Sequence, residues 1–377
     1  RSYEGRAVIY MTHCVTASTT ESTVYDDIAY PQRVHIFPET YSRSKSGMSY
    51  PPHVMFNKVI TPEVIEYVKN NPVKGKTAFL FAAGSQGWSG ISGRYDRNPD
   101  AELHYKTKIP FITLTNIFAG RIASMFGVED YVATDATACA SSLKVLMDMQ
   151  NLIFQYGFDR VIVLSGEDSV SISSLEFFGD ANACLLLEDE DKRKPSAFDN
   201  VNYGFHVGQG AALTIFESEH ADMPKPIARF LGAYTASENS TNPLGQREDG
   251  AGYIKAIEGA LLVARLDASV VKVVKTHGTG TPVNNVAEKT ALTNTLSEFI
   301  ATSYKQRIGH TLSASGLLET GLLFEDMAKG FIPAIPNRTD DDSVFISRDC
   351  PAPEGVVLSL AAGMGNVYSA ALFEAMG

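Results

Sequence analysis

Short apolar runs recur along this chain, and most of them end in a glycine or a small polar residue. A continuous apolar run of this length, bounded by turn-forming residues, is typical of a strand that is buried on both faces of a sheet. Strands of this kind are predicted over residues 6–11, 77–82, 131–134, 160–166, 211–216, 270–275 and 355–360.

Amphipathic stretches separate several of these runs. Pro62 suits the first turn of the first helix, and Gly330 followed by Pro333 closes the last one. The order of strand, loop with a reactive residue and helix occurs twice, which predicts an α/β fold of two related halves. Helices are predicted over residues 61–69, 116–127, 143–153, 252–266 and 313–329.

Three polar segments, residues 16–23, 39–53 and 85–108, are predicted to be irregular. The last of them holds the only tryptophan, Trp88. Long irregular segments inside a compact domain are usually functional or mobile.

The composition narrows the function classes. The 377 residues could form one large domain or two intimately joined ones, and 44% hydrophobic with 20% charged residues is ordinary for a soluble enzyme. A formal net charge of −11 without an offsetting basic run argues against a nucleic-acid binder. No run approaches the roughly 18 apolar residues of a membrane helix and no signal peptide is visible, so a cytoplasmic protein is expected.

The four cysteines, Cys14, Cys139, Cys184 and Cys350, are widely scattered and form no Cys-x-x-Cys pair. This spacing suggests neither a zinc site nor a disulfide framework. Cys14 and Cys184 lie in apolar contexts and are expected to be reduced core residues. No metal or redox cofactor is expected.

Cys139 lies in a turn of small residues directly ahead of a predicted helix. The positive end of a helix dipole favours a thiolate over a thiol, so this position suits a nucleophile. An isolated cysteine beside a helix is more often a small buried core residue.

Two later turns of small residues each contain a histidine, His277 in one and His310 in the other, and Lys305 lies five residues before the second. Taken singly, such histidines could cap backbone carbonyl groups, and such a lysine is usually a solvated surface charge. A nucleophile together with two histidines in glycine-containing turns is typical of a catalytic site and is not required for a hydrophobic core.

Five motifs together resemble those of the β-ketoacyl-acyl-carrier-protein synthases, the condensing enzymes of the thiolase superfamily. Each motif alone would be weak, but all five occur in the family's order and cover most of the chain. In this sequence they are the Thr137-Ala138-Cys139 turn, residues 204–211, residues 277–281, the block of residues 305–319 and residues 363–366.

The resemblance implies a thiolase-like five-layered αβαβα fold made of two pseudo-duplicated halves. The first half would be residues 1–217 with the nucleophile, and the second residues 218–377 with both histidines and the lysine. It also implies an acyltransferase that performs a decarboxylative Claisen condensation. An acyl group on Cys139 would react with malonyl-acyl-carrier protein to give β-ketoacyl-acyl-carrier protein.

The resemblance assigns further roles. His277 and His310 would donate hydrogen bonds from Nε2 to the oxygen that becomes negative during decarboxylation. Lys305 would lie inside the protein near Glu319, where it orders the site and helps set the charge of His310. Glu319 at the start of a helix could equally have a structural role through the dipole. Thr279, Thr281, Met364 and Glu319 are counted as substrate-binding residues.

Met364 departs from the family pattern, because many elongating relatives carry a phenylalanine gate over the nucleophile at this place. Methionine is flexible, so the gate is expected to be looser. The sequence 366–368 also departs from the family's Gly-Thr-Asn. These departures favour a specialised polyketide or polyene pathway over housekeeping fatty-acid synthesis.

An acyl carrier protein is the expected partner, in a homodimer or in a heterodimer with a chain-length factor, with no nucleic acid or membrane involved. An acidic carrier would need a local basic patch on this acidic chain, and Arg43 and Lys45 are candidates. Two alternatives are open. The chain could be mainly a structural subunit of a ketosynthase/chain-length-factor heterodimer, or it could be a cysteine hydrolase that uses Cys139 and one histidine.

Overall fold

The computed structural model describes residues 7–37, 53–84, 114–167, 169–220, 222–340 and 342–376. The expectations for residues 39–52 and 85–108, including Trp88, Arg43 and Lys45, lie outside this part of the chain. Within the described part, no helix is long and apolar enough to cross a membrane.

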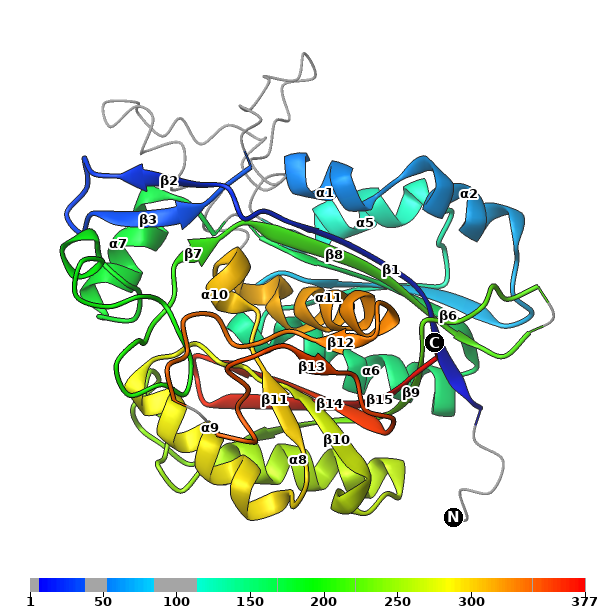
Figure 1. Ribbon diagram of the computed structural model, residues 1–377. Coiled ribbons are helices and arrows are strands. Elements are labelled where there is room, and N and C mark those ends of the chain that lie inside the picture. Colours follow the sequence, from blue (N-terminus) through cyan, green and yellow to red (C-terminus); the bar gives the residue numbers. More distant parts are fainter. Residues whose placement is uncertain are drawn as a thin grey trace.

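One mixed sheet of ten strands organises the molecule (Figure 1). Its edges are two short strands, and the middle is the antiparallel pairing of β1 with β9, in which Ile9 lies opposite Phe230. In order across the sheet the strands are β11 (Ile300–Thr302), β10 (Val271–Lys275), β14 (Val356–Gly363), β15 (Val367–Ala375), β9 (Ala228–Ser237), β1 (Ile9–Ser18), β8 (Gly210–Ser218), β6 (Phe158–Gly166), β4 (Lys76–Ala82) and β5 (Tyr131–Asp135).

The two arms of this sheet have the same topology. From the edge inward, β5-β4-β6-β8-β1 and β11-β10-β14-β15-β9 follow the same order of appearance along the chain. In each arm the two outer pairings are parallel and the two inner ones antiparallel. This repeated order supports two related halves, whereas the division at residues 217 and 218 stays a prediction.

Helices lie on both faces of each arm (Figure 1). α6 and α11 lie between the arms and contact strands of both, and a second set of helices covers the outer faces. The helices of the outer faces are α1 (His53–Val59), α2 (Pro62–Asn70) and α5 (Thr115–Met125) on one arm, and α8 (Ala251–Ala264) and α9 (Pro282–Thr295) on the other; those between the arms are α6 (Ser141–Tyr156) and α11 (Ser315–Ala328).

Smaller elements complete the chain. They are the sheet of β2 (Ser22–Tyr25), β3 (Gln32–His35) and β7 (Val207–Gly208), the pair β12 (Phe331–Ile332) and β13 (Cys350–Pro351), the helices α7 (Ile172–Asp180) and α10 (Lys305–Ile308), and the 3-10 turns η1 (Ala138–Ala140), η2 (Leu187–Asp189), η3 (Ala268–Val270) and η4 (Leu312–Ala314).

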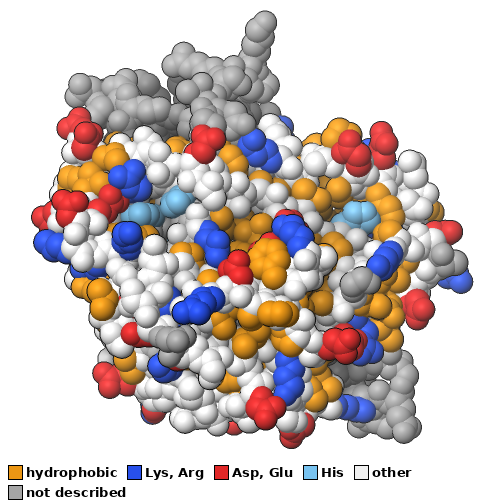
Figure 2. Space-filling model, viewed as in Figure 1, with side chains coloured by type: hydrophobic (Ala, Val, Ile, Leu, Met, Phe, Trp, Pro, Cys, Tyr) orange, Lys and Arg blue, Asp and Glu red, His pale blue; other side chains and the backbone are white. Residues whose placement is uncertain are grey.

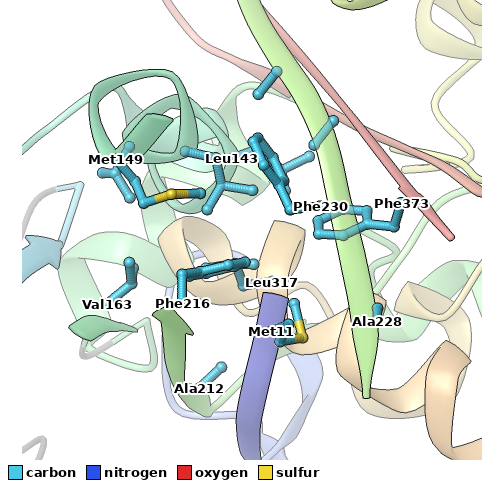
Figure 3. Close-up of a cluster of buried hydrophobic side chains, with 14 of the residues drawn as sticks. Met11, Leu143, Met149, Val163, Ala212, Phe216, Ala228, Phe230, Leu317 and Phe373 are labelled. Carbon is cyan, nitrogen blue, oxygen red and sulfur yellow. The ribbon is translucent and has the colours of Figure 1, made fainter. Parts of the chain in front are cut away.

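The largest apolar cluster fills the space between the arms (Figure 3). Leu143 of α6 and Leu317 of α11 meet Phe216 of β8 there, and the rings of Phe230 and Phe373 pack edge to face at 5.6 Å. Removing this apolar surface from water is the main force that holds the central helices to both arms. The helix that follows Cys139 is therefore anchored along its length.

Most of the predicted elements are present with small shifts in their ends. The prediction that residues 16–23 are irregular is wrong, because β1 continues to Ser18 and β2 begins at Ser22. The helix expected from Leu143 begins earlier, with η1 around the cysteine and α6 from Ser141. β9, β15 and α9 have no counterpart among the predicted elements, and β9 alternates in burial instead of forming a continuous apolar run.

Candidate active site

Cys139 is held in a tight turn between β5 and α6. Ala138 has φ +48°, a conformation that a non-glycine residue adopts only when its surroundings enforce it. Here Ser141 provides the enforcement, since its Oγ accepts the N–H of Thr137 at 2.9 Å and donates to the Ala138 carbonyl oxygen at 2.7 Å. The cysteine is thus presented in one fixed backbone geometry.

Burial works against ionisation of this cysteine. It raises the pKa of Cys139 to about 12, the carboxylate of Glu167 adds to the rise, and Lys305 opposes it. The sequence predicted that the helix end favours the thiolate, whereas in the structure burial outweighs the groups that lower the pKa of Cys139.

His277 follows the carboxyl end of β10, and its backbone is clamped by a residue that sequence reasoning missed. Glu288 of α9 is fully buried and accepts the N–H of His277 at 2.5 Å and that of Gly278 at 2.9 Å. Asn284 donates to the same carboxylate at 2.9 Å. A glutamate eleven residues after the histidine, on the helix that begins at Pro282, was the available signal.

His310 follows α10 and is fixed by its own backbone. Its Nδ1 accepts the N–H of Leu312 at 3.3 Å, so in the neutral ring the proton is on Nε2. The backbone N–H of His310 donates to the carbonyl oxygen of His206 at 2.7 Å. The motif at residues 204–211 therefore helps to hold this histidine in place.

Gly208 in that motif and Gly309 beside His310 lie where two chain segments approach each other closely. A Cβ on Gly309 would lie 2.7 Å from the Cα of Gly208, and one on Gly208 would lie 2.3 Å from the carbonyl oxygen of Ile308. Gly309 also has φ +76°. Only residues without a side chain allow these backbones to meet.

The two imidazole rings lie together and are both neutral. Their centroids are 5.8 Å apart and the rings are nearly perpendicular, at 80°. Burial lowers the pKa of each well below 6.5, and the positive charge of Lys305 lowers both further. Neutral rings in this arrangement can donate hydrogen bonds but carry no charge of their own.

Behind the histidines lies an ion cluster with no exposed surface. Lys305 donates to Oε1 of Glu319 at 2.8 Å, and Lys275 contacts Oε2 of the same carboxylate at 3.3 Å. The buried position expected for Lys305 is confirmed. The substrate-binding assignment of Glu319 is wrong, because both of its oxygens are engaged by lysines and the residue does not line the pocket.

Cys139, His277 and His310 open onto one pocket of about 380 Å³. Thr279, Thr281 and Met364, three of the four residues predicted to bind substrate, also line it. The two threonine hydroxyls are 3.1 Å apart. The remaining walls are mostly apolar and include Phe177, Phe178, Phe205, Leu244, Val283 and Tyr368.

Met364 lies in the turn that joins β14 to β15. The preceding Gly363 packs on the nucleophile turn so closely that a Cβ there would lie 2.5 Å from the carbonyl oxygen of Thr137. Met364 itself is 39% exposed and therefore does not belong to the core. It is part of the pocket wall beside Cys139.

Two family models match most of the chain. The N-terminal domain of β-ketoacyl synthase matches residues 58–221, and its C-terminal domain matches residues 227–339. The chain belongs to the β-ketoacyl synthase family. Members of this family are acyltransferases of polyketide or fatty-acid biosynthesis.

Curated relatives support the same membership. The 3-oxoacyl-[acyl-carrier-protein] synthase 2 of Vibrio harveyi is 28% identical over 61% of this chain, and the mitochondrial 3-oxoacyl-[acyl-carrier-protein] synthase of Arabidopsis thaliana is 26% identical over 68%. Other matches, from Streptomyces species, carry names from polyketide synthesis. The chain spans only 57% of the length of each of these two synthases and 62% of the first Streptomyces relative.

Solved structures of ketosynthases share the whole fold. A chain from the structure of a type II polyketide acyl-carrier protein in complex with its ketosynthase bound to the hexaketide superposes with a TM-score of 0.83 at 18% identity, covering 99% of this chain and 100% of that one. A ketosynthase in complex with its chain-length factor from Xenorhabdus doucetiae gives 0.78 at 17%, with 100% of both chains covered.

Three buried charged side chains at this site lie outside the family motifs. Glu288 clamps the His277 turn, and Lys275 shares Glu319 with Lys305. Glu167 is 1% exposed and accepts the N–H of Ser313 at 2.9 Å, in the turn that follows His310. Glu288 and Glu167 reach the histidine turns only in the tertiary structure, whereas Lys275 lies two residues before His277 and is buried beside Glu319.

Proposed function

We propose that this chain catalyses the decarboxylative condensation of an acyl group on Cys139 with a malonyl group on an acyl carrier protein. The observation that carries the proposal is the opening of Cys139, His277 and His310 onto one pocket, with the proton of His310 on Nε2. A hydrolase needs one histidine as a base beside the cysteine. A second neutral donor is explained by a reaction that builds negative charge on a thioester oxygen.

The first step is acyl transfer. The sulfur of Cys139 attacks the acyl thioester of the carrier, the carrier C–S bond breaks, and the thiol proton of Cys139 ends on the departing pantetheine thiol. Since the pKa of Cys139 is raised to about 12, the cysteine begins the step as a thiol. Backbone N–H groups of Cys139 and Met364 are assigned to the oxyanion of this step.

The second step is decarboxylation. The bond between the malonyl carboxylate and its α-carbon breaks, carbon dioxide leaves, and the electron pair moves onto the thioester oxygen. Nε2–H groups of His277 and His310 stabilise that oxygen. The α-carbon then attacks the carbonyl carbon of the acyl group on Cys139, and the bond from that carbon to the cysteine sulfur breaks. The β-ketoacyl product stays on its carrier, and the sulfur of Cys139 leaves as a thiolate that takes up a proton from water. Removal of one such donor typically costs about 3 to 4 kcal/mol.

The pantetheine arm of the carrier is assigned to the side of the pocket with Thr279 and Thr281. Their hydroxyl groups lie at its wall. Gly278 and Gly280 serve the packing of this turn, since an added Cβ would lie 2.4 Å from Oγ of Ser303 and 1.8 Å from the carbonyl oxygen of Ser196. Acidic and basic side chains are interspersed on the face shown in Figure 2. Homodimer formation and pairing with a chain-length factor are both compatible with this role.

Radiolabelled malonyl-carrier tests the proposal. The wild type should release labelled carbon dioxide, and after incubation with acyl-carrier its intact mass should increase by one acyl group. Cys139→Ala should lose the acyl adduct and remain folded, whereas Cys184→Ala, a matched change at another buried cysteine, should keep it. If the wild type shows no carbon dioxide release and no adduct, the chain is a structural subunit instead. Hydrolysis of acyl-carrier without decarboxylation would favour a hydrolase.

A further inference from the structure

The ion cluster behind the histidines contains one lysine more than the proposed reaction uses. Lys275 is the last residue of β10, two residues before His277, and is fully buried. Its Nζ donates to the Leu360 carbonyl oxygen at 2.6 Å and contacts Oε2 of Glu319 at 3.3 Å. Leu360 belongs to β14, the strand that leads to the Met364 turn.

We propose that Lys275 is a positioning residue of the condensing site, whose buried ammonium group holds Glu319 against Lys305 and keeps His277 and His310 neutral and ready to donate. The inference rests on the function proposed above. It adds a second buried cation to the site. Lys275 shares the carboxylate of Glu319 with Lys305, which is the single lysine of the family motif.

The electrostatic reason is the lack of water around the cluster. Charges interact strongly where solvent cannot screen them, and a positive field disfavours a second positive charge on an imidazole ring. Both histidines are subject to this effect from Lys275 as well as from Lys305. The same field would stabilise the negative oxygen that forms during decarboxylation.

The charged groups that face Lys275 come from three helices. Glu319 of α11 and Glu288 of α9 favour its charged form, Lys305 of α10 disfavours it, and burial is the largest influence. Together they lower the pKa of Lys275 to about 8. The ammonium group is therefore present at neutral pH and is lost as the pH rises through about 8.

Lys275→Met removes the charge with little change in side-chain volume, and Lys275→Arg keeps a charge that does not titrate below pH 10. Lys272→Met is the matched control, because Lys272 lies on the same strand but pairs with the exposed Glu298 at 3.3 Å. Circular dichroism and thermal unfolding establish that each variant folds.

The first measurement is independent of activity. In protein labelled at histidine, NMR titration should show that the midpoints of His277 and His310 rise by at least half a pH unit in Lys275→Met and stay unchanged in Lys272→Met. Unchanged midpoints in Lys275→Met would overturn the proposal. If the wild type releases no carbon dioxide from malonyl-carrier at any pH, the proposed function fails, and this titration still decides whether Lys275 holds the histidines neutral.

The second measurement is the pH profile of carbon dioxide release. The wild-type rate should fall as the pH rises through about 8. Lys275→Met should be about tenfold slower at pH 7, less than the loss of a donor that touches the substrate, and should lack that alkaline decline. Lys275→Arg should keep activity to higher pH.

An alkaline decline that persists in Lys275→Met, or an arginine variant that matches the methionine variant, would overturn the proposal. If Lys275→Met does not fold, Lys275→Gln, which keeps a donor for Leu360, takes its place. Failure of both to fold would assign Lys275 a structural role and would also overturn the proposal.

Discussion

At the scale of single residues, the site combines a nucleophile that burial keeps protonated with two histidines that burial keeps neutral. Both effects have one origin, since a group without access to water resists any change that gives it a charge. Lys305 opposes the effect of burial at Cys139 and adds to it at the histidines, because its ammonium group lowers the pKa of all three groups.

The alkylation of Cys139 by iodoacetamide should reveal this balance. We expect its rate to increase with pH and to reach no plateau below about pH 10, since the pKa of the thiol is about 12 and the thiolate is the reactive form. Lys305→Met should slow alkylation further, because it removes the charge that lowers this pKa. A plateau near pH 8 would contradict the expectation, and mass spectrometry identifies the modified cysteine.

Met364 should control which acyl groups reach Cys139. A flexible thioether fills space less rigidly than a ring, so we expect Met364→Phe to narrow acceptance among acyl-carriers of different length and unsaturation. Decarboxylation should change less, because the histidines act from another side of the pocket. Competition assays measure the preference, and Met364→Leu is the control of similar size. An unchanged preference, or an unfolded variant, would rule out the gate.

At the scale of elements, the site depends on the meeting of loops that follow strands of both arms. The Cys139 turn follows β5 in one arm, and the His277 turn follows β10 in the other. The carboxyl ends of parallel strands collect such loops at one edge. Central helices α6 and α11 fix the two arms to each other, so the loops are held in register by the core in Figure 3.

The contact between Gly208 and Gly309 offers a test of this packing. Gly309→Ala should lower the free energy of unfolding by about 2 to 5 kcal/mol, because it combines a left-handed φ with a clash against backbone. Gly127→Ala is the matched control, since Gly127 has φ +72° and nothing within 4 Å of an added Cβ, and should cost about 1 to 2 kcal/mol. Equal losses in urea denaturation would show that the close approach is unimportant.

At the scale of the whole molecule, the repeated strand order gives two arms that each contribute part of the site. In the proposed reaction, one arm would carry the acyl group on Cys139 and the other the donors His277 and His310. The pocket therefore lies where the two arms meet, and neither arm alone would contain the site.

We expect activity without a metal ion. The described residues contain no cluster of three histidine, cysteine, aspartate or glutamate side chains able to hold one, and the proposed donors are two imidazoles. Carbon dioxide release should be unchanged after dialysis against EDTA. Loss of activity that zinc or iron restores would contradict this expectation.

The sequence by itself determined the strands with continuous apolar runs, the glycine-containing turns and the choice of Cys139, His277 and His310, which line one pocket, because these signals are local. Its errors were also local in origin. The helix end near Cys139 predicted a thiolate, whereas the depth of burial, which depends on segments far away along the chain, decided for the thiol.

Only the tertiary structure decided the partners of the buried charges. Glu288, Glu167 and Lys275 lie outside the motifs, and their importance arises from contacts across 11, 146 and 44 residues of sequence. The sequence shows the same glutamate or lysine whether its charged group is solvated or buried. Its effect depends on the absence of water and on the charges around it, and packing alone sets both.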